Sequence, residues 1–148
     1  YSLESDQENF KELKNEVDNT RRYLEIEKTR FGERINYEEF IDNSCLDQKV
    51  PSMILQPLFE NAIKHGVHES TDPVVIQLKC SSSDGFLNIE VRNTMIENKK
   101  LIAGTGTGLS NVRDRLFLAY REENLMDKYQ DDKWFVVRLK IPLSHDKL

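Results

Sequence analysis

The sequence has few of the residues that cross-link small folds or bind metal ions. It contains only two cysteines, Cys45 and Cys80, which lie far apart and outside any CxxC pattern or histidine spacing typical of zinc sites. This favours reduced, structural thiols over a zinc site or a disulfide. At 148 residues the chain is long enough to close one hydrophobic core without such cross-links.

Long apolar runs and a surplus of positive charge are also missing. The longest apolar stretches are as short as residues 53–55 and 74–76, against roughly 20 residues needed to span a bilayer. No charged and apolar leader pattern opens the chain, so neither a secretory signal nor a membrane span is expected in it. The formal net charge of -5 argues against a general nucleic-acid surface. A nucleotide stays open as a ligand, because it needs only a few local cations.

The N-terminal part predicts one long amphipathic helix over residues 6–31. This segment is highly charged and repeats apolar residues along a narrow stripe, which Thr20 interrupts. Such a helix is marginal alone and needs a partner helix or a domain surface. The sequence equally allows this helix to pack on its own domain or on another domain or helix. The stripe consists of Phe10, Leu13, Val17, Leu24 and Phe31.

A strand and a second helix are expected next. Apolar and polar residues alternate over residues 35–41, which is typical of a strand with one buried face. Pro51 fits the first position of a helix that ends near Gly66, and Pro57 would kink that helix or delay its start.

Two hairpins and one further helix follow. Alternation predicts strands at residues 74–80 and 87–91, and a last hairpin that ends in a strand at residues 134–141. Residues 93–107 lack periodicity and predict a long loop before a helix at residues 108–120. The predicted fold is a two-layer α/β sandwich: a mixed, mostly antiparallel sheet with helices on one face, preceded by the long N-terminal helix.

The helix after Pro51 groups several chemically useful side chains. Gln56, Glu60 and Lys64 form one i, i+4 line, and Asn61 and His65 form the adjoining line. An amide oxygen is a hard ligand that suits Mg²⁺, and Lys64 could neutralise phosphates bound to the same ion. An ordinary solvated helix face is the alternative explanation.

Two further features could meet a ligand at this helix. The spaced glycines Gly104, Gly106 and Gly108 directly precede a helix, where backbone N–H groups favour an anion, although a flexible hinge would have the same pattern. The spacing matches neither a dinucleotide fingerprint nor a P-loop. Alternation in the second hairpin strand places Asn93 on the buried face, where it needs a partner, unless it simply forms a turn at the strand end.

In this order, the segments resemble the GHKL family of ATP-binding domains (the Bergerat fold), most closely its LytS-like sensor histidine kinases. Residues 51–66, PSMILQPLFENAIKHG, resemble the N box of the family. Residues 104–115, GTGTGLSNVRDR, resemble its G2 box and the helix that follows, and residues 23–38, YLEIEKTRFGERINYE, resemble the passage from the long helix into the first strand. The resemblance covers nearly the whole chain.

The resemblance implies an ATP site with Mg²⁺. In it Asn61 would be the Mg²⁺ ligand, Lys64 and His65 would contact phosphates, Asn93 would contact adenine, and a mobile lid would cover residues 94–107. Glu60 is the candidate catalytic acid/base group. The triphosphate would be held by Gly104, Thr105, Gly106, Thr107, Gly108 and Leu109.

The resemblance also implies partners. Such kinases move the γ-phosphate of ATP to a histidine of their dimerisation domain, then to a response regulator, commonly one with a LytTR DNA-binding domain. Residues 1–31 would be the tail of that dimerisation domain and residues 32–148 the catalytic domain. The expected setting is the cytoplasmic part of a homodimeric inner-membrane sensor without direct nucleic-acid contact. None of the three histidines, His65, His68 and His145, lies in the acceptor motif, so this fragment should not phosphorylate itself.

Two positions depart from the family pattern. The G1 box usually offers an aspartate followed by glycine to grip adenine, whereas this chain has Asn93 in the sequence VRNTM. Replacing a charge-assisted hydrogen bond by a neutral one costs roughly 1 kcal/mol, or about five- to tenfold in affinity. Pro57 stands where hydrolytic relatives such as the gyrase group carry a catalytic glutamate, so efficient free ATP hydrolysis is not expected.

Two other functions stay open at this point. The altered G1 box favours a pseudokinase that senses nucleotide or binds protein without useful catalysis. The long charged helix alone would also suit a dimerisation domain without a ligand.

Overall fold

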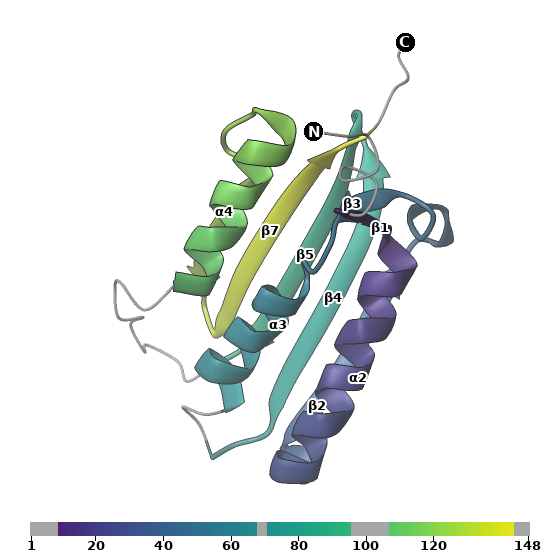
Figure 1. Ribbon diagram of the computed structural model, residues 1–148. Coiled ribbons are helices and arrows are strands. Elements are labelled where there is room, and N and C mark those ends of the chain that lie inside the picture. Colours follow the sequence, from purple (N-terminus) through teal and green to yellow (C-terminus); the bar gives the residue numbers. More distant parts are fainter. Residues whose placement is uncertain (1–8, 68–70, 96–106, 144–148) are drawn as a thin grey trace.

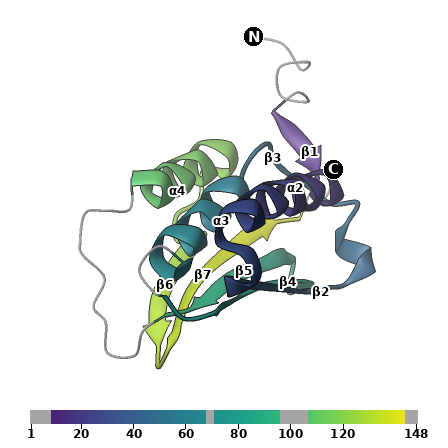
Figure 2. The ribbon, with the colours of Figure 1, turned by 90° about the horizontal axis from the view of Figure 1, so that it is seen from below.

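The computed structural model describes residues 9–67, 71–95 and 107–143, which form two layers. Three helices lie side by side on one face of a five-stranded sheet, as the two views in Figures 1 and 2 show. The helices are α2 (Leu13–Phe31), α3 (Gln56–Ala62) and α4 (Thr107–Tyr120). This arrangement confirms the predicted two-layer α/β sandwich.

The sheet is mixed and mostly antiparallel, as predicted. Its strand order is β2-β4-β5-β7-β6, and within it only the pair β2–β4 is parallel. A separate two-stranded ribbon joins β1 to β3. The strands are β1 (Phe10–Glu12), β2 (Ile35–Ile41), β3 (Lys49–Pro51), β4 (Val74–Ser83), β5 (Phe86–Thr94), β6 (Met126–Asp131) and β7 (Trp134–Pro142).

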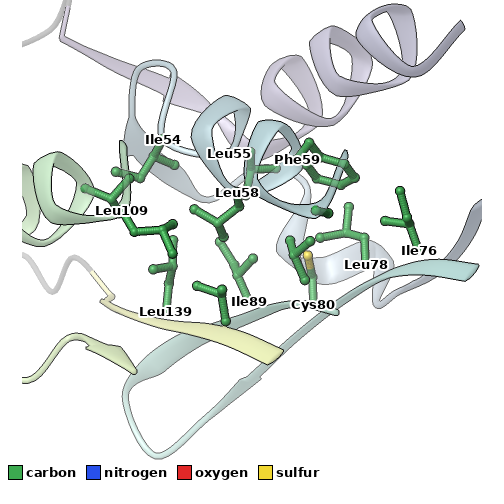
Figure 3. Packing of buried hydrophobic residues seen from close by; sticks show 14 of the residues in the cluster. Ile54, Leu55, Leu58, Phe59, Ile76, Leu78, Cys80, Ile89, Leu109 and Leu139 are labelled. Atoms are coloured by element: carbon green, nitrogen blue, oxygen red, sulfur yellow. The ribbon is translucent and has the colours of Figure 1, made fainter. Parts of the chain in front are cut away.

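The core lies between the helices and the inner face of the sheet. Alternate residues of β4 and β5 are buried, because successive side chains of a strand point to opposite faces. Figure 3 shows Leu55, Leu58 and Phe59 pointing from the α3 region toward the sheet residues Leu78 and Ile89. The two cysteines are buried and unbridged, and burial raises the pKa of the Cys80 thiol to about 12, which suits structural thiols.

The N-terminal helix begins later than the sequence predicts. Residues 10–12 form β1, which pairs with β3, so α2 starts at Leu13 rather than near residue 6. The apolar stripe packs on its own domain, since Leu13, Val17 and Leu24 are at most 2% exposed. Thr20 does not interrupt this buried face, because its hydroxyl is satisfied by the carbonyl oxygen of Val17 at 2.8 Å.

A bidentate ion pair fastens α2 to the edge strand β2. The Arg21 guanidinium donates from Nε and Nη2 to the two carboxylate oxygens of Glu39, at 2.8 and 2.6 Å. The Tyr37 hydroxyl donates to Glu39 Oε2 at 2.8 Å. The hydrogen bonds from Arg21 hold the pKa of the Glu39 carboxyl below its ordinary value.

We expect the Glu39→Gln variant to lose less free energy of unfolding in acid than the parent does. Because the pKa of Glu39 is lowered by folding, its contribution is complete above the ordinary glutamate pKa of about 4.3 and disappears as the pH falls through the folded-state pKa. The parent should therefore lose more free energy of unfolding than the variant between about pH 5 and pH 3, measured by urea titration. Glu38→Gln is the matched control, since the partner of Glu38 is the neutral Gln77. Parallel pH curves for the parent and Glu39→Gln would contradict this prediction.

The second helix starts five residues after the proline that was expected to open it. Pro51 is the last residue of β3, and α3 begins at Gln56 with Pro57 in its first turn. The prediction from Pro51 was wrong, whereas the delayed start that Pro57 suggested is confirmed. The helix continues as a π-helical turn, η3 (Ile63–Val67), and so ends close to Gly66 as predicted.

The remaining elements match the predicted hairpins and last helix, with one correction. The strand β5 extends to Thr94, so Asn93 lies inside a strand and not at the start of a loop or in a turn. Most of the loop predicted at residues 93–107, including Gly104, Thr105 and Gly106, lies outside the described residues.

Candidate functional site

The candidate site residues of α3 and η3 differ in exposure. Asn61 is half-buried, whereas Glu60 and Lys64 are exposed and His65 is 6% exposed. The Asn61 Nδ2 atom is buried and has no hydrogen-bond partner among the described residues. A buried N–H donor without a partner costs free energy, so Nδ2 is suited to an acceptor atom of a ligand, and only Oδ1 of the same amide could bind a metal ion.

A side-chain hydrogen bond joins two members of the polar line along α3. Gln56 Nε2 donates to Glu60 Oε2 at 3.3 Å, as the i, i+4 spacing predicts. Glu60 is exposed and belongs to the solvent-facing side of the helix. The Glu60 carboxylate is therefore open to solvent and is held on one side by the Gln56 amide.

His65 and Asn93 both lie next to Phe135 of β7. The ring centroids of His65 and Phe135 lie 5.9 Å apart, and Phe135 is the register partner of Asn93 on the neighbouring strand β7. Asn93 is 1% exposed, which confirms that its side chain is on the helix-covered face. Its Nδ2 donates to the carbonyl oxygen of Thr94 at 3.0 Å, which leaves Oδ1 as the acceptor end of the amide.

The backbone of η3 approaches β4 and β5 closely at Gly66. A Cβ atom added at Gly66 would lie 2.9 Å from Val74 Cγ1, 3.1 Å from Asn93 Nδ2 and 3.3 Å from Thr94 O. The π-helical turn therefore reaches β4 and β5 only because residue 66 has no side chain. π-helical turns of this kind occur frequently at functional sites.

The start of α4 is the described part of the predicted phosphate loop. This helix begins at Thr107, and among the described residues no heavy atom lies within 4 Å of a Cβ placed at Gly108, so they leave the backbone there open to a ligand. The side chain of Leu109 is 3% exposed and packs in the core. Leu109 could therefore contact a phosphate only through its backbone.

A metal ion at Asn61 would need most of its ligands from a bound molecule. Among residues 9–67, 71–95 and 107–143, no three His, Cys, Asp or Glu side chains lie close enough to hold a metal ion. Mg²⁺ commonly takes one or two protein oxygens and completes its shell with water and phosphate oxygens. The single partly buried amide of Asn61 fits that coordination.

Two side chains that hold the segment before α3 were not expected from the sequence. Glu16 of α2 is 2% exposed and accepts hydrogen bonds from the backbone N–H groups of Met53 and Leu55, just before α3. Arg115 of α4 donates to the carbonyl oxygens of Ser52 and Met53. Glu16 had a signal in the sequence, because it lies between Leu13 and Val17 on the stripe that the core buries.

Comparison with known proteins identifies the family, although no family model matches the chain. Sensor protein LytS of Oceanobacillus iheyensis is 28% identical over 91% of this chain and 26% of that protein. Sensor histidine kinase YesM of Bacillus subtilis is 31% identical over 74% of this chain and 20% of that protein. The chain belongs to the LytS-like sensor histidine kinases. It spans about a fifth to a quarter of the length of the curated relatives it matches.

The solved structures agree with this family at the level of the fold. The catalytic domain of histidine kinase ThkA superposes with a TM-score of 0.67 at 16% identity, covering 90% of this chain and 93% of that one. The match to a catalytic domain along nearly its whole length agrees with the GHKL domain of a LytS-like kinase. Among the described residues, no helix combines the length and the apolar character needed to cross a membrane.

Proposed function

We propose that this chain is the ATP-binding catalytic domain of its kinase and transfers the γ-phosphate of ATP to a histidine on the dimerisation domain. Two observations support this most. The α3–η3 segment approaches β5 so closely that a Cβ added at Gly66 would lie 3.1 Å from Asn93 Nδ2, and on the same segment the buried Asn61 Nδ2 has no partner among the described residues. The site thus combines hydrogen-bonding groups for a nucleotide with a backbone that approaches the sheet closely.

Phosphoryl transfer requires mainly positioning and charge neutralisation. Mg²⁺ bound to ATP would supply charge neutralisation at the phosphates. Asn61 would hold the metal from the side of α3, and the exposed Lys64 would add a second positive charge. The backbone at the start of α4, together with residues 104–106, would hold the triphosphate.

Adenine would be held at the other end of the site. The Nδ2 group of Asn93 is engaged by Thr94, so the amide presents an oxygen acceptor to the adenine amino group. His65 would contact a phosphate from a nearly buried position, where its ring packs against Phe135. Glu60 would serve as the acid/base group, since it is exposed on the same helix as Asn61.

The partners belong to the same proposal. Residues 1–31 would continue the dimerisation and phospho-acceptor segment, and residues 32–148 would form the catalytic domain of a cytoplasmic, homodimeric assembly. A response regulator, of the LytTR type, would receive the phosphoryl group from the acceptor histidine. The names of the relatives favour a kinase over a module without catalysis.

We expect a non-hydrolysable ATP analogue to raise the thermal stability of the chain, and Mg²⁺ to increase this effect. Ligand at about 100 times Kd stabilises a protein by about 2.7 kcal/mol, which a thermal melt detects. Mixing the chain with ATP, Mg²⁺ and a purified acceptor domain should then label the acceptor histidine. Nucleotide binding without any labelling would favour the pseudokinase, and absence of binding would contradict the proposal.

A further inference from the structure

The segment that leads into α3 is held by side chains from two other helices. Residues 52–55 have no regular secondary structure, and Met53 adopts a positive φ of 62°. Glu16 Oε2 accepts from Met53 N at 2.8 Å, and Glu16 Oε1 accepts from Leu55 N at 3.3 Å. A carboxylate that is 2% exposed is costly unless such hydrogen bonds satisfy it.

Arg115 holds the same segment through its carbonyl groups. Its Nη2 donates to Ser52 O at 2.5 Å, and its Nη1 donates to Met53 O at 3.4 Å. Glu16 on α2 and Arg115 on α4 therefore fix four backbone groups of residues 52–55 from opposite sides of α3, as the order of the three helices in Figure 2 shows.

The local sequence cannot anchor α3 by itself. The N-cap residue Leu55 makes no side-chain capping bond, and Pro57 in the first turn has no N–H group. The helix has only seven residues, so its own hydrogen bonds give it little stability. Asn61 lies six residues after Leu55, about 9 Å along the axis, and moves with any displacement of the helix start.

We propose that Glu16 and Arg115 are positioning residues, which set the start of α3 and thereby the location of the Asn61 amide toward bound Mg²⁺. This inference rests on the proposed nucleotide site. Neither side chain touches the nucleotide; each acts through the backbone of residues 52–55. Misplacing a ligand group by about 1 Å can reduce function by up to ~100-fold, so small shifts of α3 matter.

The test compares the Mg²⁺-dependent part of nucleotide affinity with folding stability. Affinity for a non-hydrolysable ATP analogue is measured with Mg²⁺ and with EDTA, and the urea midpoint is measured for each variant. In Glu16→Gln, one of the two carboxylate oxygens becomes an amide N–H group that faces a backbone N–H donor. We expect the affinity for the ATP analogue to fall by about tenfold in Mg²⁺ and by less than about twofold in EDTA. The matched control is Glu27→Gln, a largely buried glutamate of α2 whose partner is Arg30.

A second pair keeps the inference testable if Glu16→Gln does not fold. Arg115→Gln should show the same selective loss and Arg115→Lys should recover part of it, with Arg113→Gln on the exposed side of α4 as the control. Losses that are equal with Mg²⁺ and with EDTA, or that follow the urea midpoint, would overturn the positioning role. If the parent binds the ATP analogue and the variants bind it with the same affinity, this inference alone is overturned. If the parent does not bind the analogue, the proposed function is overturned and this inference with it.

Discussion

The Asn61→Asp variant should bind an ATP analogue at least about 100-fold more weakly than the parent in the presence of Mg²⁺. The substitution replaces the buried Nδ2 donor, which lacks a partner among the described residues, by a carboxylate oxygen. The new negative charge would face the phosphates in a partly desolvated position, where like charges repel strongly. Since the two side chains have nearly the same shape, the fold should be retained.

Isothermal titration with and without Mg²⁺, together with a urea titration, would measure this effect. Asn88→Asp makes the same chemical change on β5, where the amide donates to Ser83 in the exposed hairpin. That control should bind nucleotide like the parent. Equal titration curves for Asn61→Asp and the parent would remove Asn61 from the site.

Gly66→Ala should lower the free energy of unfolding by about 2 kcal/mol. The added Cβ would lie 2.9 Å from Val74 Cγ1, which is closer than a carbon–carbon contact allows. Val74 is 1% exposed and β-branched, so its side chain has little room to rotate away. Relief would require η3 to move from β4 and β5, which would also separate His65 from Phe135.

Urea unfolding and a thermal melt would measure this prediction, with an expected fall in Tm of roughly 4–8 °C for a domain of this size. Gly108→Ala is the control for stability, because its Cβ meets no heavy atom of the described residues within 4 Å and alanine favours a helix over glycine by about 0.5–1 kcal/mol. The control should be as stable as the parent or more so. An unchanged urea midpoint for Gly66→Ala would show that the π-helical turn does not pack against the sheet as described.

Local patterns in the sequence were sufficient for most elements. Alternating apolar residues identified β2, β4, β5 and β7, because a strand with one buried face repeats every two residues. The same alternation predicts that Asn93 lies on the buried face, and its 1% exposure confirms this. The fold class followed from these strands, since their apolar sides require a covering layer of helices.

Tertiary contacts decided the boundaries that local patterns could not. Residues 10–12 read as part of a helix, yet they form a strand because β3 offers backbone partners nearly forty residues away. The start of α3 was set by backbone hydrogen bonds to Glu16 and Arg115, which lie on two other helices, and not by the proline that precedes the segment.

The sequence by itself determined the layers of this protein and the residue types of its candidate site, because periodicity and side-chain chemistry are local properties. Only the tertiary structure decided how those residues meet. The contact of Gly66 with Asn93 and the buried position of Glu16 depend on segments that are distant along the chain. Such contacts form only when the core closes. The energetic effect of a buried charge or of a missing Cβ depends on the groups that pack around it.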